Sequence, residues 1–281
     1  MEVLGTHVSP ALLRKWVDWL APAKQPFYGT AKQLRSWKLQ QDDTEPDRQQ
    51  RDTYLTYHLD SRLRSVCLDE ETFMSLPQAT RAAMVRAQVT HERGAVPSVR
   101  RWRAVLGPEL KAQADGHRFV WWKPLLRGSR AAAVLPSIVG EGLHPSRHDE
   151  VTAWPTKLLP QARALAGTWS TTGEANCFGT VLAATGVKDA VETWMQREPF
   201  EQWLAAHTES GGRDDVPGTV FVWRDTAEGL VQHAGVTLGG GYMLHKPSQQ
   251  WITRREVRTV AEVRRTTRGA GWRLEKRALL Q

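Results

Sequence analysis

Three consecutive glycines, Gly239–Gly241, separate two segments of β-type sequence and constrain the fold more than any other feature of the chain. The segment before them is GLVQHAGVTL and the segment after them is YMLHK. Because glycine adopts positive φ without steric cost, this arrangement predicts an antiparallel hairpin. A hairpin centred on Gly239 would place His233 directly opposite His245, on the same face of the sheet.

Alternation along the first strand supports this assignment of faces. Ala234, Val236 and Leu238 share one face, and Leu244 of the second strand lies beside them. Gly235 belongs to the histidine face, where a residue without a side chain is expected to keep the floor of a cleft open. Two directly opposed residues have Cβ atoms about 4.5–5.5 Å apart, so one imidazole can orient the other. The alternative is a surface hairpin on which both histidines have no chemical role.

Cys177 stands at the predicted start of a helix. Asn176 before it is a favourable N-cap, and the residues after it, FGTVLAAT, are apolar and small, as in a buried helix. A helix N-terminus has unpaired N–H groups and partial positive charge, which favour a thiolate and can bind an oxyanion. The structural alternative is a buried cysteine that acts as a small hydrophobic residue.

Four segments combine these residues in order: Asn176–Gly179, Pro217–Val222, His233–Gly239 and Met243–His245. Within residues 165–265, this pattern resembles the NlpC/P60 family of papain-like hydrolases. The resemblance implies that Cys177 attacks an amide carbonyl, that His233 is its base and that His245 orients this base. This sequence has Asn-Cys-Phe-Gly where the family usually has Asp-Cys-Ser-Gly. Around these residues we assign Phe178, Trp169 and Gly235 to substrate binding.

The expected activity is that of a thiol hydrolase, an amidase or peptidase that cleaves an amide or isopeptide bond through a cysteine acyl-enzyme. The substrate would be a small peptide, an amide metabolite or a protein, and no cofactor is expected. Acyl transfer to a second nucleophile is an alternative, because it needs the same thiolate and base. A catalytically inactive interaction protein on the same fold is another.

A nucleic-acid-binding protein is the remaining alternative. Residues 251–281 carry nine Lys or Arg against three Glu, and the chain contains 13 Trp. Basic and aromatic residues can contact phosphates and stack on bases. No helix-turn-helix, RNP or zinc-finger pattern occurs in the sequence. The simpler interpretation of the basic residues is a strand surface exposed to solvent.

The order of predicted elements indicates an α+β protein, with a mostly helical region at 1–160 and an NlpC/P60-like catalytic domain at 161–281. That domain would be a papain-like core, in which the nucleophile helix packs on an antiparallel sheet. In the first region we expect helices at 11–20, 53–66 and 77–92, then a strand at 117–126 and an irregular connection at 136–160. In the second we expect the Cys177 helix, one or two helices within 189–207, strands at 218–223, 229–238 and 242–246, and edge strands at 257–265 and 271–279.

Location and metal binding follow from what the sequence lacks. No apolar stretch approaches the roughly 18–20 residues of a membrane span, so no membrane partner is expected. The N-terminus has no signal-peptide pattern, which indicates a cytoplasmic protein if Met1 is the native start. Cys67, in a predicted helical segment, is assigned a structural role. His144 and His148 are a remote metal pair, and no metal site is predicted.

Overall fold

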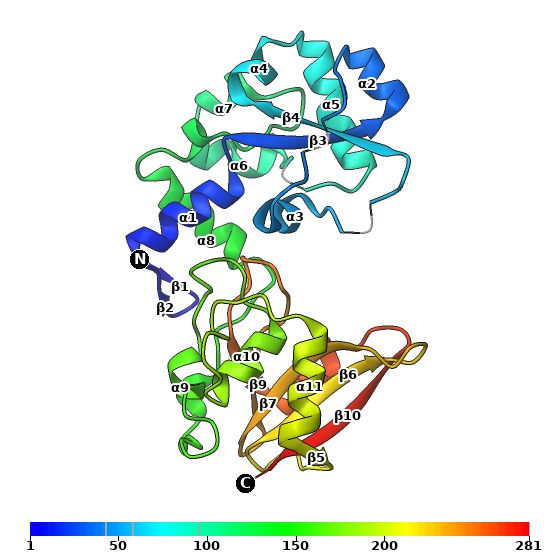
Figure 1. The fold of residues 1–281 in the computed structure, drawn as a ribbon. Helices are drawn as coiled ribbons and strands as arrows, with labels where there is room; N and C mark the ends of the chain where they lie inside the picture. The colour runs from blue at the N-terminus through cyan, green and yellow to red at the C-terminus, as the bar shows by residue number, and fades with distance from the viewer. Residues whose placement is uncertain (43, 58, 95, 281) are drawn as a thin grey trace. The chain divides into compact units, whose positions relative to one another are not determined.

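The computed structural model describes residues 1–42, 44–57, 59–94 and 96–280, which form two compact units (Figure 1). Unit 1 consists of Met1 and Val8–Val139, and unit 2 consists of Glu2–His7 and the chain from Gly140 onward. The units therefore divide at residues 139 and 140, whereas the sequence analysis placed the boundary at 160 and 161. Residues 140–160 belong to unit 2 because they pack in its core, as Leu159 does.

Unit 1 combines helices with a two-stranded antiparallel sheet of β3 and β4. The helices predicted at 11–20 and 77–92 are confirmed, and Ser9 caps the first of them. Its elements are α1 (Pro10–Leu20), β3 (Lys24–Thr30), α2 (Ala31–Trp37), α3 (Arg48–Tyr54), β4 (Leu63–Asp69), α4 (Glu70–Ser75), α5 (Gln78–Thr90), α6 (Val99–Leu106), α7 (Glu109–Gln113), the 3₁₀ helix η1 (Lys123–Leu126) and α8 (Arg130–Val139).

Two predictions in this unit are wrong. The helix expected at 53–66 is wrong, because residues from Leu63 onward form strand β4. In this strand Val66 and Leu68 are buried at alternate positions, and Cys67 pairs with Pro26. The strand expected at 117–126 does not form. Among the described residues there, only Arg118 makes isolated bridges, and residues 119–122 are buried without a ladder. A buried apolar run satisfies a strand pattern even where no neighbouring strand pairs with it.

Unit 2 is built on a sheet in the order β5-β10-β6-β7-β8-β9, with antiparallel neighbours. This mixture of helices and antiparallel sheets fits the predicted α+β class. Its elements are β1 (Glu2–Val3), β2 (Thr6–His7), the 3₁₀ helix η2 (His148–Glu150), α9 (Ala162–Leu165), α10 (Cys177–Ala184), α11 (Arg197–His207), β5 (Thr208–Ser210), β6 (Thr219–Asp225), β7 (Val231–Gly239), β8 (Tyr242–His245), β9 (Glu256–Thr259), α12 (Val260–Thr266) and β10 (Trp272–Leu279).

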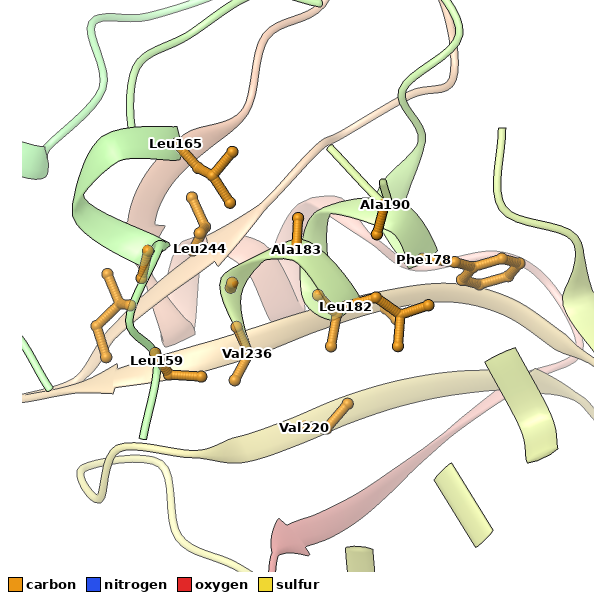
Figure 2. Close-up of a cluster of buried hydrophobic side chains, with 14 of the residues drawn as sticks. Leu159, Leu165, Phe178, Leu182, Ala183, Ala190, Val220, Val236 and Leu244 are labelled. Atoms are coloured by element: carbon orange, nitrogen blue, oxygen red, sulfur yellow. The ribbon is translucent and has the colours of Figure 1, made fainter. Parts of the chain in front are cut away.

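The largest apolar core of unit 2 lies between α10 and the sheet (Figure 2). Val236 and Leu244 point from β7 and β8 toward Leu182 of α10, and Ala234 and Leu238 belong to the same cluster. This confirms the predicted apolar face of the hairpin. Helix α12 contributes to a separate cluster with Phe221, Trp223 and Met243. These two clusters fix the sheet between α10 and α12, and thereby the position of the hairpin.

The last two strand predictions need correction. In the segment 257–265, residues 257–259 belong to strand β9 and residues 260–265 to helix α12, because Thr259 and Glu262 form a reciprocal capping box that starts α12. β10 forms where expected but is not an edge strand, since it pairs with both β5 and β6. Among the described residues, no helix is both long enough and apolar enough to cross a membrane.

Candidate active site

The glycine hairpin forms as predicted, but its register differs by two residues. Gly240 and Gly241 make the turn, with φ of 60° and 81°, which favour glycine. Gly239 belongs to β7 and pairs with Tyr242, so the chain turns after Gly239 and not on it. An irregularity lies between Thr237 and Gly239, and beyond it Gly235, not His233, opposes His245. Because side chains alternate with period two, the shift leaves His233 and His245 on one face. The two imidazoles are diagonal neighbours.

The two imidazoles nevertheless contact each other. His233 Nε2 lies 3.3 Å from His245 Nδ1, and the ring planes are nearly perpendicular, at 88°. Both side chains are buried, and Trp223 packs 5.3 Å from the His233 ring, centroid to centroid. This contact uses Nε2 of His233, so Nδ1 is the ring nitrogen that does not contact His245. His245 is therefore placed to orient the His233 ring.

Helix α10 begins at Cys177, as the sequence predicts. Asn176 Oδ1 accepts the Gly179 N–H at 2.9 Å, and Asn176 Nδ2 donates to Met195 O at 2.8 Å. A first turn has no intrahelical acceptors for its leading N–H groups, here those of Cys177 and Phe178. Gly179 is required for a separate reason, since a Cβ there would lie 2.8 Å from Ala190 O.

Cys177, His233 and His245 line one cleft of about 720 Å³. They come from the start of α10 and from neighbouring strands β7 and β8. Among the described residues, no hydrogen bond joins Cys177 Sγ to either imidazole. The thiol does lie close to β7, where the backbone N–H of Ala234, the residue after His233, lowers the pKa of the thiol. The cleft thus brings together Cys177 and His233, which are 56 residues apart in sequence, and His245, which lies 12 residues after His233.

Burial controls the protonation of the cleft. It raises the pKa of the Cys177 thiol to about 11, and the N–H groups of Ala234 and Phe178 and the charge of Lys246 oppose this shift only in part. Burial also lowers the pKa of His233 to about 3, and His245 adds to the effect. The cleft at rest therefore holds a neutral thiol, Cys177, and a neutral imidazole, His233.

Glu256 extends the site in a way that the sequence analysis missed. It pairs with His245 across β8 and β9, and its Oε1 lies 3.6 Å from His245 Nε2 and 3.0 Å from Arg258 Nε. Burial opposes ionisation of Glu256, but His245 and Arg258 outweigh it and lower the pKa of the carboxyl. A buried carboxylate therefore stands behind His245. Only the pairing of β9 with β8 places it there, and alternation alone does not reveal which strands are neighbours.

No family model, curated protein or solved structure matches this chain. The resemblance to NlpC/P60 hydrolases accordingly rests on the cysteine segment and the histidine hairpin, and remains a proposal.

The three residues assigned to substrate binding occupy different environments. Phe178 lines the cleft, but its ring stacks on Phe200 at 4.6 Å between centroids. The open floor expected at Gly235 is wrong, because a Cβ there would lie 2.8 Å from Met243 Sδ. Trp169 is buried outside the cleft lining, where its Nε1 donates to Ile252 O at 3.4 Å and Arg254 lies over its ring.

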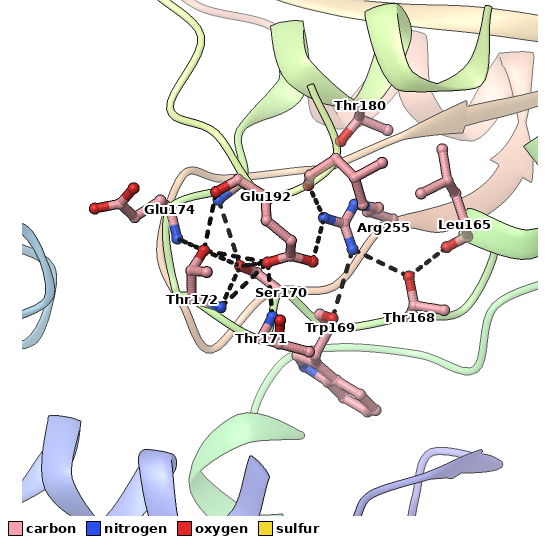
Figure 3. Close-up of polar contacts among 12 residues, drawn as sticks. Leu165, Thr168, Trp169, Ser170, Thr171, Thr172, Glu174, Thr180, Glu192 and Arg255 are labelled. Atoms are coloured by element: carbon pink, nitrogen blue, oxygen red, sulfur yellow. Dashed lines mark hydrogen bonds and ion pairs between the residues drawn. The ribbon is translucent and has the colours of Figure 1, made fainter. Parts of the chain in front are cut away.

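An ion pair between the buried Arg255 and the partly buried Glu192 is the centre of a polar network (Figure 3). Arg255, almost fully buried, lies 3.0 Å from Glu192 Oε1 and also donates to Val191 O. The other oxygen of Glu192 accepts the Ser170 hydroxyl at 2.6 Å and the Thr171 N–H at 2.8 Å. Glu192 precedes the lining residues 194–197, so the network holds the segment that enters the cleft wall.

Most of the basic charge in residues 251–281 is not available to an external polyanion. Five of its cations are in ion pairs with acids, namely Arg255 with Glu192, Arg258 with Glu256, Arg264 and Lys276 with Asp214, and Arg277 with Glu275. Arg254 is buried and donates to backbone carbonyls of Leu4 and His144. This arrangement gives less support to phosphate-backbone binding than the sequence count suggests. Among the described members of this set, Arg268 is the arginine that lines the cleft.

The lowered pKa of His233 predicts loss of stability in acid. Unfolded chains bind the proton near pH 6.5 and the native state only near pH 3, so the free energy of unfolding should fall as pH drops below 6.5. His233 alone should contribute a slope that approaches about 1.4 kcal/mol per pH unit between about pH 6 and 4.5. Urea unfolding, followed by hydrogen exchange in peptides that cover β7, measures it.

His233→Gln removes the titrating group, and we expect the slope over this interval to become shallower by that amount. His207→Gln is the matched control, because His207 is an exposed histidine of the same unit, and it should keep the wild-type slope. An unchanged slope in His233→Gln would mean that His233 is not a buried neutral imidazole.

Proposed function

We propose that this protein is a cysteine hydrolase that cleaves an amide or isopeptide bond through an acyl-enzyme on Cys177. The observation that carries the proposal is the cleft shared by Cys177, His233 and His245, with His233 Nε2 held 3.3 Å from His245 Nδ1. A nucleophile, a base and a group that orients the base are the parts of a catalytic triad. Glu256 adds a buried carboxylate on the far side of His245.

The reaction would begin from the neutral pair. As Cys177 Sγ attacks the substrate carbonyl carbon, the thiol proton passes to Nδ1 of His233, and His245 and Glu256 stabilise the imidazolium that forms. Nucleophile and base commonly close to hydrogen-bond distance only when the substrate is bound. The carbonyl oxygen, now an oxyanion, would be met by the N–H groups that open α10, those of Cys177 and Phe178.

Collapse of this intermediate breaks the carbon–nitrogen bond. The amine leaves with the proton from His233, and the acyl group stays on Cys177 as a thioester. Water then attacks the thioester, with His233 again taking a proton, and the carboxylic acid and the thiol are restored.

The chain contains its own control for this proposal. Cys67 and Cys177 are both partly buried thiols whose pKa is raised to about 11, but among the described residues only Cys177 shares a cleft with an imidazole pair. We expect a simple acyl donor, the butanoyl thioester of N-acetylcysteamine, to acylate Cys177 and to spare Cys67. The readout is acid quenching, proteolysis and mass spectrometry of both cysteine peptides, with thiol release followed in parallel.

Acylation of both cysteines at similar rates would mean that Cys177 is an ordinary thiol and would overturn the proposal. Cys177→Ala supplies the background for thiol release. A faster release in this variant than in buffer would point to a nucleophile other than Cys177.

A further inference from the structure

The charged side chains around the cleft are of one sign. Apart from the histidines, the ionisable side chains of known sign in its lining are Arg197, Lys246 and Arg268, and no Asp or Glu is among the described lining residues. Lys246 is buried and fixed, since its Nζ donates to Ser248 O at 2.6 Å and to Thr253 Oγ1 at 2.7 Å. Its charge faces the thiol and lowers the thiol's pKa.

The two arginines differ from Lys246 because they are exposed at the cleft. Arg197 Nε donates to Val231 O at 2.9 Å, which fixes the side chain against β7 but uses one of its five N–H donors. Arg268 follows the end of α12 and belongs to the same lining. In the part of the chain that the structure describes, neither guanidinium is in an ion pair. By contrast, Arg224 and Arg264 outside the cleft both have carboxylate partners.

A cleft lined by one sign of charge concentrates ligands of the opposite sign. Guanidinium groups bind carboxylates through paired, charge-assisted hydrogen bonds, which are stronger than hydrogen bonds between neutral groups. Two indoles, Trp194 and Trp272, lie along the same lining and offer apolar surface beside these charges. An anionic group attached to a short hydrocarbon segment would fit both features.

We propose that the substrate carries an anionic group, a carboxylate, close to the bond that is cut, and that Arg197 and Arg268 bind it. This inference rests on the proposed function, because it assigns the substrate class of the same cleft. The favoured substrates are acidic amides or peptides. Neutral amides of the same length are expected to react more slowly.

Four thioesters test the proposal on both sides of the reacting carbonyl. Butanoyl and succinyl groups compare a neutral with an anionic acyl side, and each is joined either to N-acetylcysteamine or to 3-mercaptopropionate, which has an anionic leaving side. The measured quantity is the rate constant for acylation of Cys177. The wild type should favour an anionic donor on at least one side by about tenfold or more, the scale of a charge-assisted hydrogen bond. Added salt should reduce this preference.

Arg268→Gln and Arg197→Gln should each reduce the ratio of anionic to neutral rates, and the double variant should bring it close to one. Arg265→Gln is the matched control, because Arg265 is an exposed arginine of α12 outside the lining, and it should keep the wild-type ratio. Equal rates with all four donors, or a preference that survives the double variant, would overturn the substrate assignment and leave the hydrolase proposal in place. Failure of every donor to acylate Cys177 would overturn both.

Discussion

Replacing Cys177 by alanine is expected to reduce thioester turnover by a factor on the order of 10⁴ or more, with little change in the thermal unfolding midpoint. The loss follows because Cys177 is the cysteine that lines the cleft with the imidazole pair, and removing a nucleophile removes the covalent route that starts on it. Stability should hold because the change deletes one sulfur atom at the first position of α10, and the helix keeps its cap at Asn176. Steady-state kinetics and circular dichroism of the same preparation measure both.

Cys67→Ala is the control for this substitution. Cys67 lies in β4, opposite Pro26, in the unit that does not contain the cleft. We expect this variant to keep wild-type turnover. Comparable activity in Cys177→Ala and wild type would contradict the assignment of the nucleophile.

Replacing His233 by glutamine is expected to lower the acylation rate by about 10²–10⁴-fold, the usual contribution of a general base. Glutamine can still reach His245 but cannot take the thiol proton, and burial holds the pKa of Cys177 near 11, so little thiolate is available without a base. His245→Gln should lose less, because it orients the base and does not carry the proton. A comparison of the two variants at one pH measures this order, and a larger loss at His245 would contradict it.

The sequence predicts the helix start and the hairpin of the candidate site better than it predicts the two units around them. The helix start at Cys177 follows from Asn176 and from small apolar residues, and the hairpin follows from Gly239–Gly241. Both signals are local, so tertiary contacts do not override them. The register was wrong by two residues because glycines permit several turn geometries. The prediction that His233 and His245 share a face holds despite this error, because a shift of two residues keeps both side chains on one face.

The predictions that were wrong or absent share a physical cause, which is that the residues that contact each other are distant in sequence. The segment 63–66 pairs with β3, and residues 119–122 are buried without a partner strand. Glu256 reaches His245 only because β9 lies beside β8. Gly235 could be interpreted as an open floor because nothing in the pattern indicates that Met243 packs against it. Local propensity and period do not contain this information.

The pH dependence of Cys177 acylation, in a Cys67→Ala background with and without His233→Gln, tests the central claim most directly. A base acts when it is neutral, and burial lowers the pKa of His233 to about 3, so the acid limb of the rate should lie well below pH 6.5. In His233→Gln the rate should instead rise about tenfold per pH unit, following the thiolate fraction of a thiol whose pKa is near 11. Identical profiles that both follow this thiolate fraction would contradict the account, because Cys177 would then react without help from His233.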